Sequence, residues 1–182
     1  MRTRDTPRFG TMRELDLQDR TVLIRVDFNV PIADGEIVDD ARIRATLPTI
    51  DAVLKQRGTR LVLFSHLGRP SGAPDKTLRM APIARRLAEL VKARVMPVDA
   101  CIGPKVIAAA AQLGPGEILM LENVRFHPGE EANDERFAAE LAELGDVYLN
   151  DAFGAAHRAH ASTVGCLLYT SPRPRAATLS RM

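Results

Sequence analysis

Residues 21–26, Thr21-Val-Leu-Ile-Arg-Val26, form a short run that is almost continuously apolar and rich in β-branched side chains. A polar stretch, Asp27-Phe-Asn-Val-Pro31, follows it directly. Runs of this length and character are typical of strands that are covered on both faces of a parallel sheet. This part of the sequence therefore predicts a buried parallel strand that ends in polar residues.

Four further runs of the same kind follow, and segments with helical periodicity separate them. Ile43, Leu47, Ile50 and Val53, for example, recur at the spacing of one helix face. Alternating strands and helices are typical of repeated βα units. We therefore expect an α/β fold, a doubly wound, Rossmann-like three-layer parallel sheet with helices on both faces. The other predicted strands are residues 60–65, 93–98, 117–121 and 146–150.

A proline lies inside the first predicted helix. Pro48 has no backbone N–H, so this helix is expected either to be kinked or to restart near Thr46. Asp39 or Asp40 could cap its N-terminus.

Composition excludes several classes of protein. The 182 residues are 46% apolar and 26% charged, with a net charge of +2, which fits one globular domain and not a disordered chain. The sequence has no run near the ~18 apolar residues of a membrane span and no apolar signal-peptide core, so we expect a cytoplasmic protein. Cys101 and Cys166 have no metal-ligand spacing around them and read as small apolar residues. Basic runs and aromatic platforms for nucleic acids are also missing.

Polar residues follow four of the predicted strands, and in a doubly wound sheet ligands bind beyond these carboxyl ends. Arg69, Arg125 and Arg158 would gather there with His66, and Arg42 at the start of the first helix could join them. Several guanidinium groups at one site suit a small polyanion, best a phosphorylated acid.

Each of these residues also has a structural interpretation. A single arginine could pair with Asp27 or Asp151, and His66 alone could simply satisfy a hydrogen bond. Asp27 and Asn29 could form turns or accept hydrogen bonds from substrate hydroxyls. For the remaining histidines, solvent-exposed or helix-capping roles are favoured over metal ligation; these are His127, His157 and His160.

Known nucleotide-binding motifs are absent from the sequence. None of its four lysines follows a glycine, so it has no phosphate-binding loop of the G-x-x-x-x-G-K type. The nearest dinucleotide fingerprint, at residues 114–119, precedes a strand instead of following one. Composition and pattern alone thus predict an acidic-metabolite site and name no enzyme.

Five collinear motifs at these same positions resemble the amino-terminal domain of the phosphoglycerate kinase family. They cover residues 12–165, which we expect to be one domain after an extension at residues 1–11. Residues 166–182 match nothing expected of the family and are predicted to be a poorly ordered tail. The motifs are Arg25-Val-Asp-Phe-Asn-Val-Pro31, Ala41-Arg-Ile43 with Leu47-Pro-Thr-Ile50, Ser65-His-Leu-Gly-Arg-Pro70, Leu121-Glu-Asn-Val-Arg125, and Asn150 to Ser162.

The resemblance implies phosphoryl transfer between 1,3-bisphosphoglycerate and ADP, giving 3-phosphoglycerate and ATP in glycolysis. Asp27 and Asn29 would bind the glycerate hydroxyl and carboxyl region, and Arg42 would be the catalytic residue that reaches the migrating group. The substrate-binding set implied in this way is Asp27, Phe28, Asn29, Arg42, His66, Leu67, Gly68, Arg69, Arg125 and Arg158.

The family's carboxy-terminal half, which binds Mg-ATP or Mg-ADP, has no counterpart in the sequence. The resemblance therefore implies that this chain binds phosphoglycerate, holds no nucleotide, cofactor or metal itself, and is an inactive monomeric fragment without that missing domain. We interpret the tail as a sign of a truncated gene. The alternatives are a stand-alone module that binds acidic metabolites without catalysis and, less favoured, a generic nucleotide- or flavin-binding domain.

Overall fold

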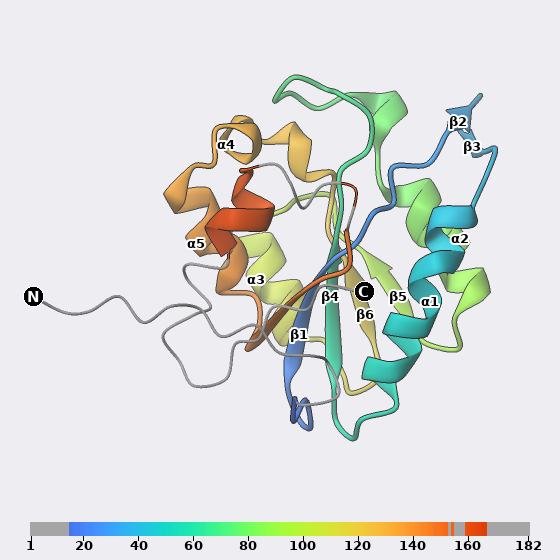
Figure 1. The fold of residues 1–182 in the computed structure, drawn as a ribbon, viewed down its shortest axis with the longest axis vertical. Coiled ribbons are helices and arrows are strands. Elements are labelled where there is room, and N and C mark those ends of the chain that lie inside the picture. Colours follow the sequence, from blue (N-terminus) through green and yellow to red (C-terminus); the bar gives the residue numbers. More distant parts are fainter. Residues whose placement is uncertain (1–14, 153, 155–158, 167–182) are drawn as a thin grey trace, which may run out of the picture.

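The computed structural model describes residues 15–152, 154 and 159–166. Its centre is a five-stranded, fully parallel sheet with the order β5-β6-β4-β1-β7 (Figure 1). This confirms the predicted parallel α/β architecture. The predicted site residue Arg158 and the predicted extension at residues 1–11 lie outside the described residues. Of the predicted tail at residues 166–182, only Cys166 is described, and it is buried in the core. The strands are β1 (Thr21–Arg25), β4 (Arg60–Phe64), β5 (Val95–Pro97), β6 (Ile118–Met120) and β7 (Val147–Asn150).

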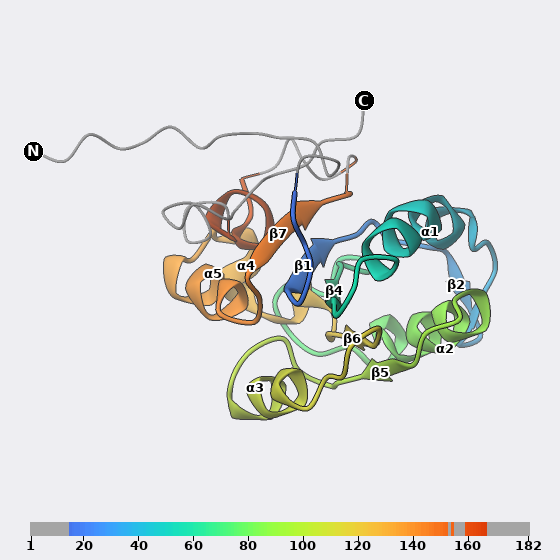
Figure 2. The same cartoon turned by 90° about the horizontal axis from the view of Figure 1, so that it is seen from below.

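Helices cover both faces of this sheet, as Figure 2 shows in the view from below. The helices α1 (Ala41–Leu54) and α2 (Ala81–Leu90) pack on one face, and α3 (Pro104–Ala111) and α5 (Glu135–Ala142) pack on the other. The predicted three layers are therefore present. Shorter elements are η2 (Lys76–Leu78), η3 (Val124–Phe126), α4 (Pro128–Glu131) and the π-helical turn η5 (Ala161–Gly165).

Strand β4 shows why the apolar runs are continuous. Leu61 and Leu63 pack in the core beneath α1 and α2, whereas Val62 and Phe64 pack in the core beneath α3 and α5. Successive side chains of a strand point to opposite faces, so a sheet covered on both faces needs apolar residues at every position. Each predicted strand contains the observed one, which is shorter by one to three residues because the end residues already belong to loops.

Helix α1 does not restart near Thr46, because it runs without interruption through Pro48. The helix buries Ile43, Ile50 and Val53 against the sheet, and this burial outweighs the single backbone hydrogen bond that proline cannot donate. Asp40 is the N-cap residue but its side chain makes no cap hydrogen bond; it binds Arg44 and Arg86 instead.

A small hairpin that was not predicted from the sequence lies between β1 and α1. Its strands are β2 (Ile32–Ala33) and β3 (Glu36–Ile37), which pair antiparallel. Asp34 and Gly35 connect them with φ angles of 51° and 79°. An Asp-Gly pair is a strong signal for a two-residue hairpin turn, so the sequence did contain the clue.

The helices of the described part of the chain are all too short or too polar to cross a membrane.

The central position of β4 makes one side chain a sharp test of the core. Leu63 is fully buried between β1 and β6, so Leu63→Ala is expected to lower the free energy of unfolding by about 2–5 kcal/mol. Val38→Ala is the control, because Val38 is 67% exposed and its truncation should have little effect. Urea unfolding followed by circular dichroism measures both; equal midpoints for the two variants would contradict this packing.

Candidate functional site

The loops that follow β4 and β6 leave the same edge of the sheet in opposite directions. The loop after β4 leads to α2 on one face, and the segment after β6 leads through η3 and α4 to α5 on the other face. Adjacent strands whose connections diverge in this way open a crevice at their carboxyl ends. The candidate site lies at this edge, together with the loop after β1.

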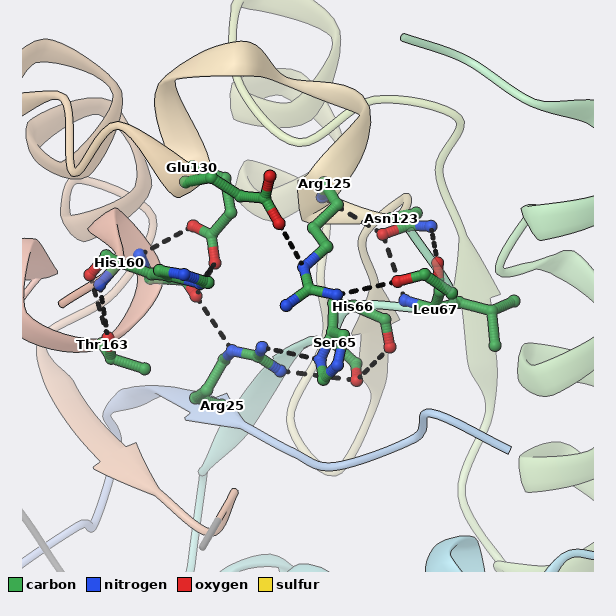
Figure 3. Close-up of polar contacts among 12 residues, drawn as sticks. Arg25, Ser65, His66, Leu67, Asn123, Arg125, Glu130, His160 and Thr163 are labelled. Atoms are coloured by element: carbon green, nitrogen blue, oxygen red, sulfur yellow. Dashed lines mark hydrogen bonds and ion pairs between the residues drawn. The ribbon is translucent and has the colours of Figure 1, made fainter. Parts of the chain in front are cut away.

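Arg25, the last residue of β1, is the centre of a polar network at this edge (Figure 3). Its side chain is 1% exposed, although a guanidinium keeps its charge at any relevant pH. Its Nε donates to Ser162 Oγ at 2.9 Å and its Nη1 to the carbonyl of Val26 at 2.6 Å. Arg25 was not among the predicted site residues, and the signal available in the sequence was a charged residue inside an otherwise apolar run.

The same guanidinium fixes the protonation pattern of His66. Arg25 Nη2 lies 3.0 Å from His66 Nδ1. Guanidinium nitrogens can only donate, so Nδ1 accepts this hydrogen bond and the ring proton lies on Nε2. His66 is therefore a neutral ring that offers an N–H donor at Nε2.

Glu130 in α4 is a fully buried carboxylate on the other side of this network. Its Oε2 accepts from the Ser162 backbone N–H at 2.9 Å, and its Oε1 accepts from Ser162 Oγ at 2.5 Å. Burial by itself raises the pKa of Glu130, but the hydrogen bond from His160, the charge of Arg25 and the bonds from Ser162 together hold that pKa below its usual value. The carboxylate is ionised and stabilises the nearby Arg25 charge.

The side chain of Asn123 ties the loop after β4 to the segment after β6. Its Oδ1 accepts from the N–H groups of Leu67 and Arg125, at 3.2 and 3.1 Å. Its Nδ2 donates to the carbonyls of Leu67 and Leu78, at 2.8 and 3.1 Å. The amide is fully buried and its four hydrogen bonds hold both loops in one arrangement.

Gly68 is held on both sides of its position in the loop. Its N–H donates to Asn29 Oδ1 at 2.9 Å, and its carbonyl accepts from Arg125 Nη1 at 2.8 Å. Its φ of 61° favours glycine, and a Cβ there would lie 2.7 Å from Leu78 Cδ2. The loop is thus fixed directly before Arg69, whose side chain is exposed.

Asp27 has two carboxylate oxygens in different situations. Oδ2 accepts a hydrogen bond from Arg42 Nη1 at 2.5 Å. The sequence left open whether an arginine of the site pairs with Asp27, and Arg42 does so. Oδ1 is buried and accepts no hydrogen bond from any residue that the structure describes. More than half of the Arg42 side chain is exposed. The pair therefore combines an unused buried acceptor with an accessible cation.

The structure brings most of the predicted site residues to this one edge. The side chains of Phe28 and Leu67 are buried in the core, so any ligand contact they make would use backbone groups. Arg158 and His157 lie outside the described residues. His127 caps α4, as expected, by accepting from the Gly129 N–H at 3.1 Å. The predicted residues that lie at this edge are Asp27, Phe28, Asn29, Arg42, His66, Leu67, Gly68, Arg69 and Arg125.

Groups of three or more metal-ligating side chains are absent from the part of the chain that the structure describes.

The four hydrogen bonds of Asn123 predict a large cost for its removal. Asn123→Ala leaves the buried N–H and carbonyl of Leu67 and the partly buried carbonyl of Leu78 without this partner, so the free energy of unfolding should fall by about 3 kcal/mol. The exposed Gln18→Ala serves as the control. Chemical unfolding measures the difference, and a loss for Asn123→Ala no greater than that for Gln18→Ala would show that the amide does not hold the loops.

The lowered pKa of Glu130 predicts a pH-dependent contribution to stability. A folded-state pKa below the unfolded one stabilises the protein above the ordinary glutamate pKa of about 4.3, and this stabilisation is lost as the pH falls through the folded value. The free energy of unfolding of wild type should therefore exceed that of Glu130→Gln most at neutral pH. The difference should narrow as the pH becomes acidic. Unfolding curves across this pH range test the sign. A constant gap, as expected for the exposed Glu143→Gln, would contradict it.

Comparison with known proteins points to one family. The family model described as Phosphoglycerate kinase matches residues 12–177, a range that extends beyond the motif-based boundary at residue 165. The phosphoglycerate kinase of Moorella thermoacetica is 57% identical over 159 residues, which cover 87% of this chain and 40% of that protein. The phosphoglycerate kinase of Rubrobacter xylanophilus is also 57% identical, over 155 residues.

Solved structures agree with this match. The structure of phosphoglycerate kinase from Coxiella burnetii superimposes with a TM-score of 0.79 at 36% identity, and the match covers 94% of this chain and 41% of that one. The chain thus spans about 40% of the length of the curated relatives it matches. The family model covers most of the chain, and the fold agrees with the solved structures. The chain belongs to the phosphoglycerate kinase family.

Proposed function

We propose that this chain forms the phosphoglycerate-binding half of a phosphoglycerate kinase, which transfers a phosphoryl group between 1,3-bisphosphoglycerate and ADP to give 3-phosphoglycerate and ATP. The observation that carries the proposal is the buried Oδ1 of Asp27, an acceptor without a donor among the described residues, beside the cation of Arg42. A glycerate hydroxyl is a neutral donor that would satisfy this oxygen, and the neighbouring arginines would neutralise the ligand's charges.

The other site residues take roles that follow from their positions. Asn29 holds the Gly68 N–H and thereby sets the loop that carries His66 and Arg69. His66 would donate its Nε2 proton to an anionic group, and Arg69 would reach the ligand from the exposed end of the loop. We assign Arg125 and Arg158 to the remaining anionic oxygens, with Arg125 already oriented by the Gly68 carbonyl.

Arg42 is the proposed catalytic residue. Phosphoryl transfer needs in-line positioning and stabilisation of charge on the migrating group, and an exposed guanidinium near the substrate hydroxyl suits this task. A general base is unnecessary, because the acceptor carboxylate has an ordinary pKa of about 4 and is ionised at neutral pH. His66 then serves in binding and does not carry protons.

We assign the nucleotide and its magnesium ion to the carboxy-terminal half of the family's proteins, outside the 40% of their length that this chain matches. When bound there, the magnesium nucleotide would supply or accept the phosphoryl group. Exclusion of water would follow from closure of the two halves over the substrate. Alone, this chain is therefore proposed to bind phosphoglycerate as a cytoplasmic monomer and to catalyse nothing.

The second candidate is a stand-alone module that binds acidic metabolites without catalysis. The same cationic edge supports it, because an arginine cluster recognises carboxylates as well as phosphates. The two candidates differ in whether a partner half restores catalysis.

Binding is tested by calorimetric titration of 3-phosphoglycerate into the chain and into an Arg42→Ala, Arg69→Ala double variant. Loss of two charge-assisted contacts should weaken binding by about a hundredfold or more. A matched Arg85→Ala, Arg136→Ala variant removes two exposed arginines elsewhere on the surface and should bind normally. Two salt concentrations separate specific binding from general anion attraction. Absence of saturable binding in folded wild-type protein would contradict the proposed site.

Catalysis is tested separately with ATP and 3-phosphoglycerate in a coupled assay. We expect no turnover by the chain alone and measurable turnover after addition of a separately produced carboxy-terminal half from a relative, such as the Moorella thermoacetica protein. Turnover by the chain alone would contradict the division of labour. Binding without rescue by several such halves would favour the non-catalytic module.

A further inference from the structure

A continuous chain of polar contacts leads from α4 to the site loop. Glu130 Oε1 contacts Ser162 Oγ at 2.5 Å, Ser162 Oγ contacts Arg25 Nε at 2.9 Å, and Arg25 Nη2 contacts His66 Nδ1 at 3.0 Å (Figure 3). The four residues come from α4, η5, β1 and the loop after β4. All are buried, and the first three are outside the set of residues assigned to the substrate.

The donors and acceptors in this series of contacts allow only one direction of hydrogen bonding. Arg25 can only donate, so Ser162 Oγ accepts from Nε and has its single proton left for Glu130. An ionised carboxylate can only accept, so Glu130 takes that proton as a hydrogen bond and takes a second one from the Ser162 N–H. Each partner thereby fixes the next, and the series ends at Nδ1 of His66.

We propose that Glu130 and Ser162 are positioning residues that hold the Arg25 guanidinium in place and thereby keep His66 in the tautomer with its proton on Nε2. His66 then presents a donor at the candidate site, and its use for an anionic substrate group rests on the proposed function. In metal sites a carboxylate that binds a histidine ring directly fixes its tautomer and orientation; here Glu130 acts on His66 through Ser162 and Arg25.

A purely structural role makes a different prediction. If Glu130 merely neutralised the buried charge of Arg25, its loss would lower stability without changing the His66 ring, since Arg25 also donates to the Val26 carbonyl and to Ser65 Oγ. A readout at the His66 nitrogens separates the two roles.

The experiment is nitrogen NMR of the histidine rings in the ¹⁵N-labelled chain at neutral pH. His66 is assigned by comparison with His66→Gln. In wild type, Nδ1 should show the shift of an unprotonated nitrogen and Nε2 that of a protonated one. In Glu130→Gln and in Ser162→Ala, both nitrogens should move toward averaged shifts, because Arg25 is released and the two tautomers exchange. Ser162→Thr keeps the hydroxyl and should retain the wild-type pattern.

Two controls match these variants. Leu141→Val creates a small cavity in the core beneath α5 without touching the polar chain, so it lowers stability while leaving His66 unchanged. Glu143→Gln removes an exposed charge at the C-terminal end of α5, outside the polar chain. Wild-type ring shifts in folded Ser162→Ala or Glu130→Gln would overturn the proposal, as would the proton-on-Nδ1 tautomer in wild type.

Titration with 3-phosphoglycerate adds the functional readout. Affinity should fall about tenfold in Ser162→Ala, the worth of one misplaced hydrogen bond to a charged ligand, and should be unchanged in Leu141→Val. A wild-type chain that shows the expected tautomer but binds no 3-phosphoglycerate would contradict the proposed function and leave the positioning role supported. Unchanged affinity in Ser162→Ala with an altered tautomer would overturn the link to the substrate.

Discussion

The charge of Arg25, buried at the carboxyl end of the first strand, is the constraint on which the site depends. Removing a guanidinium from water is costly unless it is paired and hydrogen-bonded. This requirement brings Ser162, His66 and the nearby Glu130 carboxylate together from separate elements of the chain. The same contacts that compensate the charge also join the sheet to α4 and η5, so the site and the fold share one set of interactions.

The parallel sheet then determines what can surround this charge. All five strands end at the same edge, and the connections from β4 and β6 leave it toward opposite faces. Asn123 and Gly68 fix the loop after β4 and the segment after β6, which diverge at this edge. The outcome is an edge with a rigid inner layer and an exposed outer layer of Arg42 and Arg69. A rigid inner layer lowers the entropic cost of holding a small anion, since few side chains need to be ordered on binding.

Much of this architecture is readable in the sequence. The apolar runs reveal the strands because a sheet covered on both faces needs apolar residues throughout, and Asp27, Asn29 and His66 could be placed because they directly follow such runs. Arg25 and Glu130 were missed because their importance lies in contacts with Ser162, which is 137 positions from Arg25 and 32 positions from Glu130 in sequence. The sequence pattern around each residue does not reveal such a contact. The helix restart near Thr46 that Pro48 left open is absent for a related reason, since tertiary burial of α1 outweighs a local helix-breaking signal.

The proposed binding of phosphoglycerate at this edge of the sheet is tested most directly by amide NMR of the labelled chain during titration with 3-phosphoglycerate. It predicts saturable shift changes concentrated in the loops after β1, β4 and β6, at residues 27–30, 66–69 and 122–125, with α3 and α5 unaffected. Saturable changes centred on any other part of the surface, or none in the folded chain, would contradict it.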